Sequence, residues 1–108
     1  MKILFDQGTP APLRCSLLGH EITTAFERGW NELQNGDLLA AAESEGFAAI
    51  VTTDTNLRYQ QNLADRQVAI VVLMTTDWRL IQQHTDYVAE AVNGLASGAY
   101  VELPFPPR

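Results

Sequence analysis

Two aspartates of this 108-residue chain each follow a short apolar stretch. Asp6 follows Ile-Leu-Phe at 3–5, and Asp54 follows an apolar run at 48–51 and two threonines. Short apolar runs with β-branched residues, bounded by turn-forming residues, predict buried strands. A buried strand that ends at an aspartate delivers a carboxylate to the edge of a sheet. We therefore expect these two acids to lie side by side at one edge of a parallel sheet.

Asp37 adds a third acid that could reach the same edge. It lies at the start of a helix predicted at 38–45, which leads into the strand that ends before Asp54. A right-handed crossover starts such a helix from the carboxyl end of the preceding strand. Three carboxylates without a His or Cys pair suit Mg²⁺ or Mn²⁺ rather than zinc. Metal-held water that attacks a phosphodiester is the chemistry such a cluster most often serves.

Each aspartate also has a purely structural interpretation. Asp37 in a first helical turn would interact favourably with the helix dipole. Asp54 could close an Asx-turn, with Asn56 capping the next segment, and Asp6 could do the same above Gly8. An uncompensated acidic cluster would repel itself, so all three acids on one edge would favour a functional role.

The elements that must position these acids alternate along the chain. Strands are predicted at 2–5, 20–25, 48–53, 67–73 and 99–103, helices at 10–18, 38–45 and 77–95, and a short helix or ordered loop at 56–63. This alternation predicts an α/β fold with three layers, α/β/α, around a mainly parallel sheet with right-handed crossovers. The expected strand order is 2-1-3-4, with the fifth strand at an edge. A crevice then forms at the carboxyl ends of strands one and three, where Asp6 and Asp54 lie.

Four residues have expected local roles in these elements. Thr9 and Asn35 are candidate N-caps of the first and second helices, and Asp77 is an N-cap or first-turn acid of the third. Cys15 falls on the predicted apolar side of the first helix, where we expect inert packing.

Length and composition restrict the class of protein. The chain is long enough for a single domain, 1–108, and its formal net charge is −6. This charge argues against a general electrostatic grip on nucleic acid, although bound cations could reverse its sign locally. A single cysteine and the lack of a signal-peptide pattern predict a cytoplasmic protein. The longest apolar run, at 68–74, is too short to span a membrane.

Four segments of the chain carry a family resemblance: 2–6 with Pro10 soon after, 29–30, 37–42, and 51–54 with Asn56. Together they resemble the PIN (PilT N-terminus) domains, and more closely the short bacterial PIN-like proteins of unassigned function. The resemblance covers nearly the whole chain. It implies a metal-dependent ribonuclease, the toxin of a toxin–antitoxin pair with an antitoxin as partner, and a homodimer. It also implies that Asp6, Asp37 and Asp54 are the catalytic and metal-binding acids.

The chain departs from this family at two points. PIN domains usually carry a further acid between the second strand and the helix that Asp37 begins, and both Glu27 and Glu32 are candidates here. The short relatives often have a glutamate directly after the first aspartate, where this chain has Gln7. A neutral residue there weakens a two-metal mechanism.

A polar segment after Asp54 offers candidate substrate contacts. Arg58 could hold a phosphate, Tyr59 could stack on a base, and Asn56 is a third candidate for binding the RNA substrate. The alternative is a solvated helix face with Tyr59 partly buried.

Two functions from different classes follow. The first is a PIN-like ribonuclease that hydrolyses phosphodiester bonds with Mg²⁺ or Mn²⁺ bound by its acids. The second is a PIN-like binding or interaction module without catalysis, which Gln7 and the acidic composition favour. A phosphorelay receiver shares the strand order, but this chain lacks the paired acids after strand one and the late lysine of that class.

Overall fold

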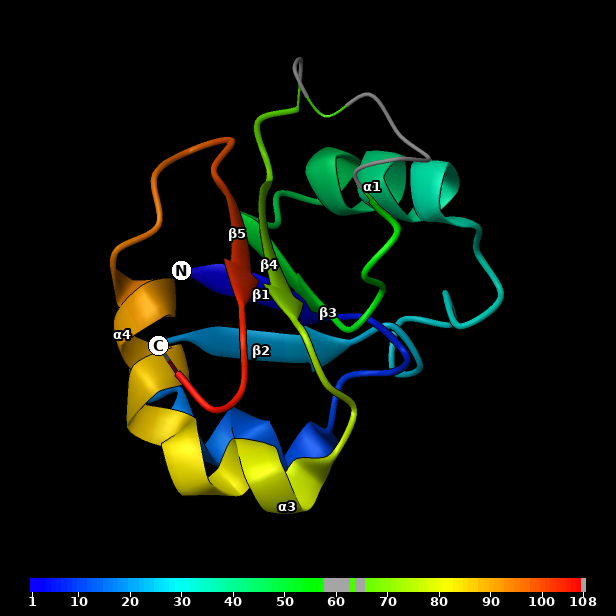
Figure 1. The fold of residues 1–108 in the computed structure, drawn as a ribbon. Helices are drawn as coiled ribbons and strands as arrows, with labels where there is room; N and C mark the ends of the chain where they lie inside the picture. Colours follow the sequence, from blue (N-terminus) through cyan, green and yellow to red (C-terminus); the bar gives the residue numbers. More distant parts are fainter. Residues whose placement is uncertain (58–62, 64–65, 108) are drawn as a thin grey trace.

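The fold is a five-stranded parallel sheet with helices on both faces (Figure 1). The computed structural model describes residues 1–57, 63 and 66–107. The sheet order is β2-β1-β3-β4-β5. The strands are β1 (Lys2–Phe5), β2 (Glu21–Thr24), β3 (Ala49–Thr52), β4 (Ala69–Leu73) and β5 (Tyr100–Leu103). The α/β class is confirmed, and the order contains the expected 2-1-3-4 with the fifth strand at an edge.

Helices cover both faces of the sheet. One face carries α1 (Asn35–Ser44), and the other carries the 3₁₀ helix η1 (Ala11–Ser16) and α4 (Thr85–Asn93) (Figure 1). The short helices α3 (Trp78–Ile81) and η2 (Gln82–His84) lead directly into α4. Each face has its own buried apolar cluster, so the molecule has three layers.

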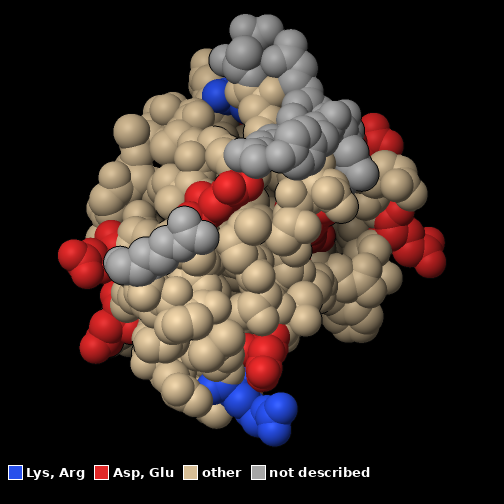
Figure 2. Space-filling model, viewed as in Figure 1, with Lys and Arg blue, Asp and Glu red and all other residues tan. Residues whose placement is uncertain are grey.

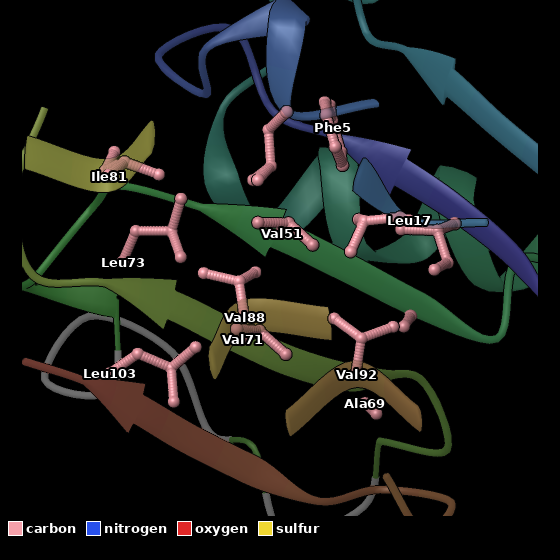
Figure 3. Packing of buried hydrophobic residues seen from close by; sticks show 13 residues of the cluster. Phe5, Leu17, Val51, Ala69, Val71, Leu73, Ile81, Val88, Val92 and Leu103 are labelled. Carbon is pink, nitrogen blue, oxygen red and sulfur yellow. The ribbon is translucent and has the colours of Figure 1, made fainter. Parts of the chain in front are cut away.

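Alternation along the strands divides the core between these two clusters. Phe5, Val51 and Val71 pack with Val88 and Val92 of α4 on one face (Figure 3). The preceding residue of each strand faces the other side of the sheet. These residues, Leu4, Ile50 and Ile70, pack with Leu38 and Leu39 of α1. Both β3 and β4 are buried along their whole length, which explains why their sequences are continuous apolar runs.

The first helical segment differs from its prediction. It is a 3₁₀ helix that ends at Ser16 rather than an α-helix that reaches Leu18, and its N-cap is Pro10. The Thr9 hydroxyl does not cap it but donates to the Val51 carbonyl at 2.8 Å. With about three residues per turn, the 3.6-residue pattern that placed Cys15 inside does not apply. Cys15 is exposed, so the prediction that it packs in the core was wrong.

The second helix begins three residues earlier than predicted. Asn35 lies inside α1, and the N-cap is Gln34, whose side chain makes no capping hydrogen bond. The cap assigned to Asn35 was therefore wrong, because the extended backbone that precedes the helix falls on Gln34. The predicted end is confirmed: Gly46 follows the helix with φ of +80°, a conformation that glycine adopts without strain.

The long helix predicted at 77–95 is divided into three pieces. Asp77 is its N-cap as predicted, since its Oδ1 accepts a hydrogen bond from Arg79 N at 2.9 Å. After Ile81 the chain forms η2, which buries no side chain, and α4 then starts with Asp86 in its first turn. Ile81, Val88 and Val92 are buried in the α-helical pieces on either side, whereas the residues of η2 are all at least partly exposed. No helix within the described ranges is long and apolar enough to cross a bilayer.

Candidate functional site

The loops that follow β1 and β3 are joined at the carboxyl edge of the sheet. Phe5 and Val51 are register partners in the two strands, and Asp6 N donates to the Val51 carbonyl at 2.9 Å. The Thr9 hydroxyl donates to that same carbonyl. Parallel pairing therefore brings the residue after β1 next to the last residue of β3, Thr52, as the predicted topology requires.

The Thr52 hydroxyl contacts both the carboxylate of Asp6 and the backbone N–H of Asp54. The side chain of Thr52 is buried, with 1% exposure, and its Oγ1 lies 2.8 Å from Asp6 Oδ2 and 3.1 Å from Asp54 N. Because the Asp54 N–H can only donate, the hydroxyl accepts from it and directs its own proton to the Asp6 carboxylate. Sequence reasoning missed this residue. The available signal was a hydroxyl at the end of a buried strand, two positions before an aspartate.

Further hydrogen bonds fix the two carboxylates. Asp6 Oδ1 accepts from Gln7 N at 2.8 Å, so each oxygen of this carboxylate receives a neutral donor. Asp54 Oδ1 accepts from Asn56 N at 2.9 Å, which is the Asx-turn considered from the sequence. Both aspartates are half-buried at the same edge of the sheet. The structure thus brings Asp6 and Asp54 together and also gives each a local structural role.

A close approach of the two loops restricts how these acids can move. A Cβ atom added to Gly8 would lie 2.5 Å from Thr53 Oγ1, a distance that real Cβ contacts do not reach. The absence of a side chain at residue 8 leaves room for the Thr53 hydroxyl where the two loops approach each other. The site is therefore built on two mutually packed loops rather than on a loose surface segment.

Asp37 does not join the other two acids. It is exposed in the first turn of α1, where a negative charge interacts favourably with the helix dipole. Across the described ranges, no three His, Cys, Asp or Glu side chains lie close enough together to hold a metal ion. The expected convergence of three acids is therefore absent from this part of the chain. Arg58 and Tyr59 lie outside the described residues.

The two candidates for a further acid are placed differently. Glu27 Oε1 accepts from Thr24 N at 2.9 Å, Thr24 Oγ1 accepts from Glu27 N at 3.0 Å, and the Arg14 guanidinium pairs with the same carboxylate. The Thr24 N–H and the Arg14 side chain lower the pKa of Glu27. This carboxylate therefore stabilises the turn after β2. Glu32 is exposed in the loop before α1.

The chemistry of the remaining donor set suits a hard cation. Asp6 and Asp54 supply carboxylate oxygens from adjacent strand ends, and Mg²⁺ is commonly bound through one or two carboxylates while it keeps several waters. These two acids match the type of donor set that Mg²⁺ takes, and they form a smaller set than the three expected from the sequence.

A hollow lies at the opposite edge of the sheet, where the strands start. Its volume is about 380 Å³, and its lining includes Ala48, Gln67 and Val68 before the starts of β3 and β4. Glu43 at its wall pairs with Arg66 at 2.6 Å and accepts from Gln67 N at 3.0 Å. Burial opposes ionisation of Glu43, but the hydrogen bonds from Arg66, Gln67 and Val68, together with the charge of Arg66, outweigh it and lower the pKa of this carboxyl. The carboxylate of Glu43 therefore has a structural role at this edge.

The face of the molecule seen in Figure 2 has no broad basic area for nucleic acid among the residues described. Figure 2 shows acidic side chains spread over one face of the molecule, with Lys and Arg visible only near two of its margins, among the residues described.

Comparison of the chain with protein-family models, with functionally curated proteins and with solved structures found no match.

Proposed function

We propose that this protein is a PIN-like, metal-dependent endoribonuclease. The observation that carries this proposal is the pair Asp6 and Asp54 at the carboxyl ends of adjacent strands, linked through one buried hydroxyl of Thr52. In open α/β sheets, ligands bind outside the carboxyl ends of the strands where the winding direction reverses, and this reversal lies between β1 and β3.

In this proposal Asp6 and Asp54 bind Mg²⁺ or Mn²⁺. A divalent ion bound there supplies an ionised water and neutralises charge on a phosphodiester. The chain itself supplies orientation: the Thr52 hydroxyl and Gln7 N–H hold the Asp6 carboxylate, and the Asx-turn to Asn56 holds that of Asp54. Fixed carboxylates need little reorganisation when substrate arrives, which is how pre-organised sites lower reaction barriers.

RNA is the proposed substrate, with Arg58 as a phosphate contact and Tyr59 and Asn56 as further contacts. The resemblance to PIN domains extends the proposal to a cytoplasmic toxin whose antitoxin covers the acidic edge, and to a homodimer.

Cleavage of RNA by metal-free protein to which Mn²⁺ is returned tests the proposal. Asp6→Asn removes one carboxylate while it keeps the size of the side chain, and we expect cleavage to be lost. Asp86→Asn is the matched control, because it makes the same change in the first turn of α4, at an exposed position. Equal cleavage by wild type and Asp6→Asn would refute the role of Asp6 in catalysis, and no cleavage by either protein with Mn²⁺ present would refute the nuclease activity.

A non-catalytic interaction module is the second candidate. It is favoured by the position of Asp37 away from the other acids and by the ion pair that engages Glu27. In that case the wild-type protein would be folded, would cleave no RNA with any divalent ion, and would show no difference in melting temperature when Mn²⁺ is added.

A further inference from the structure

Phe26 is a large apolar side chain that the fold leaves in water. Its exposure is 73%, whereas phenylalanine is normally among the buried residue types. It comes two residues after the end of β2, the strand that pairs with β1. Ala25 N donates to the Phe5 carbonyl at 2.8 Å, so Phe26 begins its turn beside the loop that carries Asp6. This aromatic ring therefore belongs to the same edge of the sheet as the candidate site.

The turn that carries Phe26 is held firmly. Gly29 N donates to the Phe26 carbonyl at 3.0 Å, and Gly29 has φ of +75°, which favours glycine. Trp30 N donates to the carbonyl of Ala25, a residue with only 1% exposure. The reciprocal hydrogen bonds between Thr24 and Glu27 hold the same turn. The exposure of the ring thus follows from a hydrogen-bonded turn and not from a loose end of the chain.

We propose that Phe26 is a stacking platform for an unpaired base of single-stranded RNA, with the adjoining phosphate at the edge formed by Asp6 and Asp54. This inference rests on the proposed function. A chain of net charge −6 gains little from general phosphate attraction over its surface, so contacts that do not depend on charge should contribute strongly to its affinity for RNA. Stacking on an aromatic face is such a contact, it tolerates any base, and it requires a base that is free of a duplex.

Leu18 provides a matched control for this ring. It is also exposed, at 84%, and it lies in the turn before β2 rather than after it. It has no π face and is at the other end of the strand. A general apolar attraction would involve Leu18 as well as Phe26, whereas base stacking at the acidic edge would involve Phe26 alone.

The test is binding of a fluorescein-labelled single-stranded RNA, measured by anisotropy with Ca²⁺ in place of Mn²⁺ and with the RNA verified as intact after each titration. A divalent cation is kept because the two carboxylates would otherwise repel the phosphate. We expect Phe26→Ala to weaken binding by roughly ten- to a hundredfold, since one stacked base contributes about that much. Phe26→Tyr keeps the ring and should bind like wild type, as should Leu18→Ala. The same RNA in a perfect duplex should bind weakly and should not respond to Phe26→Ala.

The outcomes separate this inference from the function on which it rests. Unchanged binding by Phe26→Ala, equal losses in Phe26→Ala and Leu18→Ala, or a Phe26→Tyr that binds like Phe26→Ala would overturn the platform. So would wild-type protein that binds no single-stranded RNA but captures a protein partner through Phe26. If Asp6→Asn still cleaves RNA while Phe26→Ala loses binding, the platform stands and the assignment of the catalytic acids falls.

Discussion

The two edges of the sheet use acidic residues in opposite ways. At the edge where the strands start, Glu43 faces a hollow of about 380 Å³ and is paired with Arg66. At the edge where β1 and β3 end, the Asp6 carboxylate is held by a hydroxyl and a backbone N–H, both neutral donors. An acid paired with arginine stabilises the fold, whereas an oriented acid held by neutral groups is the arrangement that the proposed cation site requires. A search for a site by the size of a hollow would select the edge where the strands start. The chemistry of the donors instead selects the edge where β1 and β3 end.

Replacing an acid at each edge should separate their roles most strongly. We expect Asp54→Asn to lower Mn²⁺-dependent RNA cleavage by more than the roughly 10- to 100-fold that outer partners of a metal site contribute. Glu43→Gln should leave the rate per folded molecule unchanged. Initial cleavage rates, normalised to the folded fraction from circular dichroism, measure this difference. Comparable losses in the two variants would abolish the functional distinction between the edges.

Thr52→Val tests the role of the Thr52 hydroxyl. It keeps the shape of the buried side chain but removes the donor to Asp6 and the acceptor for Asp54 N. We expect cleavage to fall roughly 10- to 100-fold, and the free energy of unfolding to fall by about 1–3 kcal/mol. Thr52→Ser retains the hydroxyl and should recover most of the activity. A serine variant as impaired as the valine variant would show that packing, not the hydroxyl, matters.

Gly8→Ala tests the contact between the two loops of the carboxyl edge. The new Cβ would meet Thr53 Oγ1 at 2.5 Å, so we expect a loss of about 1–3 kcal/mol in unfolding free energy, as for overpacked sites. Gly8→Ala combined with Thr53→Ala removes the colliding oxygen and should restore much of this loss. Denaturant unfolding of both single variants and the double variant gives the coupling energy. If the changes in unfolding free energy of the two single variants were strictly additive in the double variant, a contact between residues 8 and 53 would not explain the loss.

The pH dependence of stability should reveal the smallest difference between the edges. The pKa of Glu43 is lowered from 4.5 in the folded protein, so its stabilising contribution is complete above that value. The contribution is lost as the pH falls through the folded pKa. We expect Glu43→Gln to destabilise the protein by no more than about 1 kcal/mol near neutral pH, and this difference should shrink below pH 4.5. Urea unfolding from pH 3 to 7 measures it, and a difference that grew on acidification would have the wrong sign.

Local sequence patterns were sufficient for the sheet but not for the partners of the acids. Apolar runs and alternation predicted every strand to within one or two residues, and topology then placed Asp6 and Asp54 at one edge. The start of β4 shifted from 67 to Ala69 where Gln67 N bonds to Glu43, a contact 24 residues away. The roles of Thr52 and Glu27 escaped prediction for the same reason, since Asp6 and Arg14 reach them only after the chain has folded.

Diffraction from crystals grown with Mn²⁺ tests the central claim most directly, because the anomalous signal of the ion locates it independently of the protein atoms. We predict one strong peak at the carboxyl edge, within about 2.2 Å of carboxylate oxygens of both Asp6 and Asp54. We also predict that the peak disappears in Asp6→Asn crystals. A peak only beside Glu43 at the opposite edge, or none at millimolar Mn²⁺ with Thr52 still bridging the two aspartates, would contradict the account.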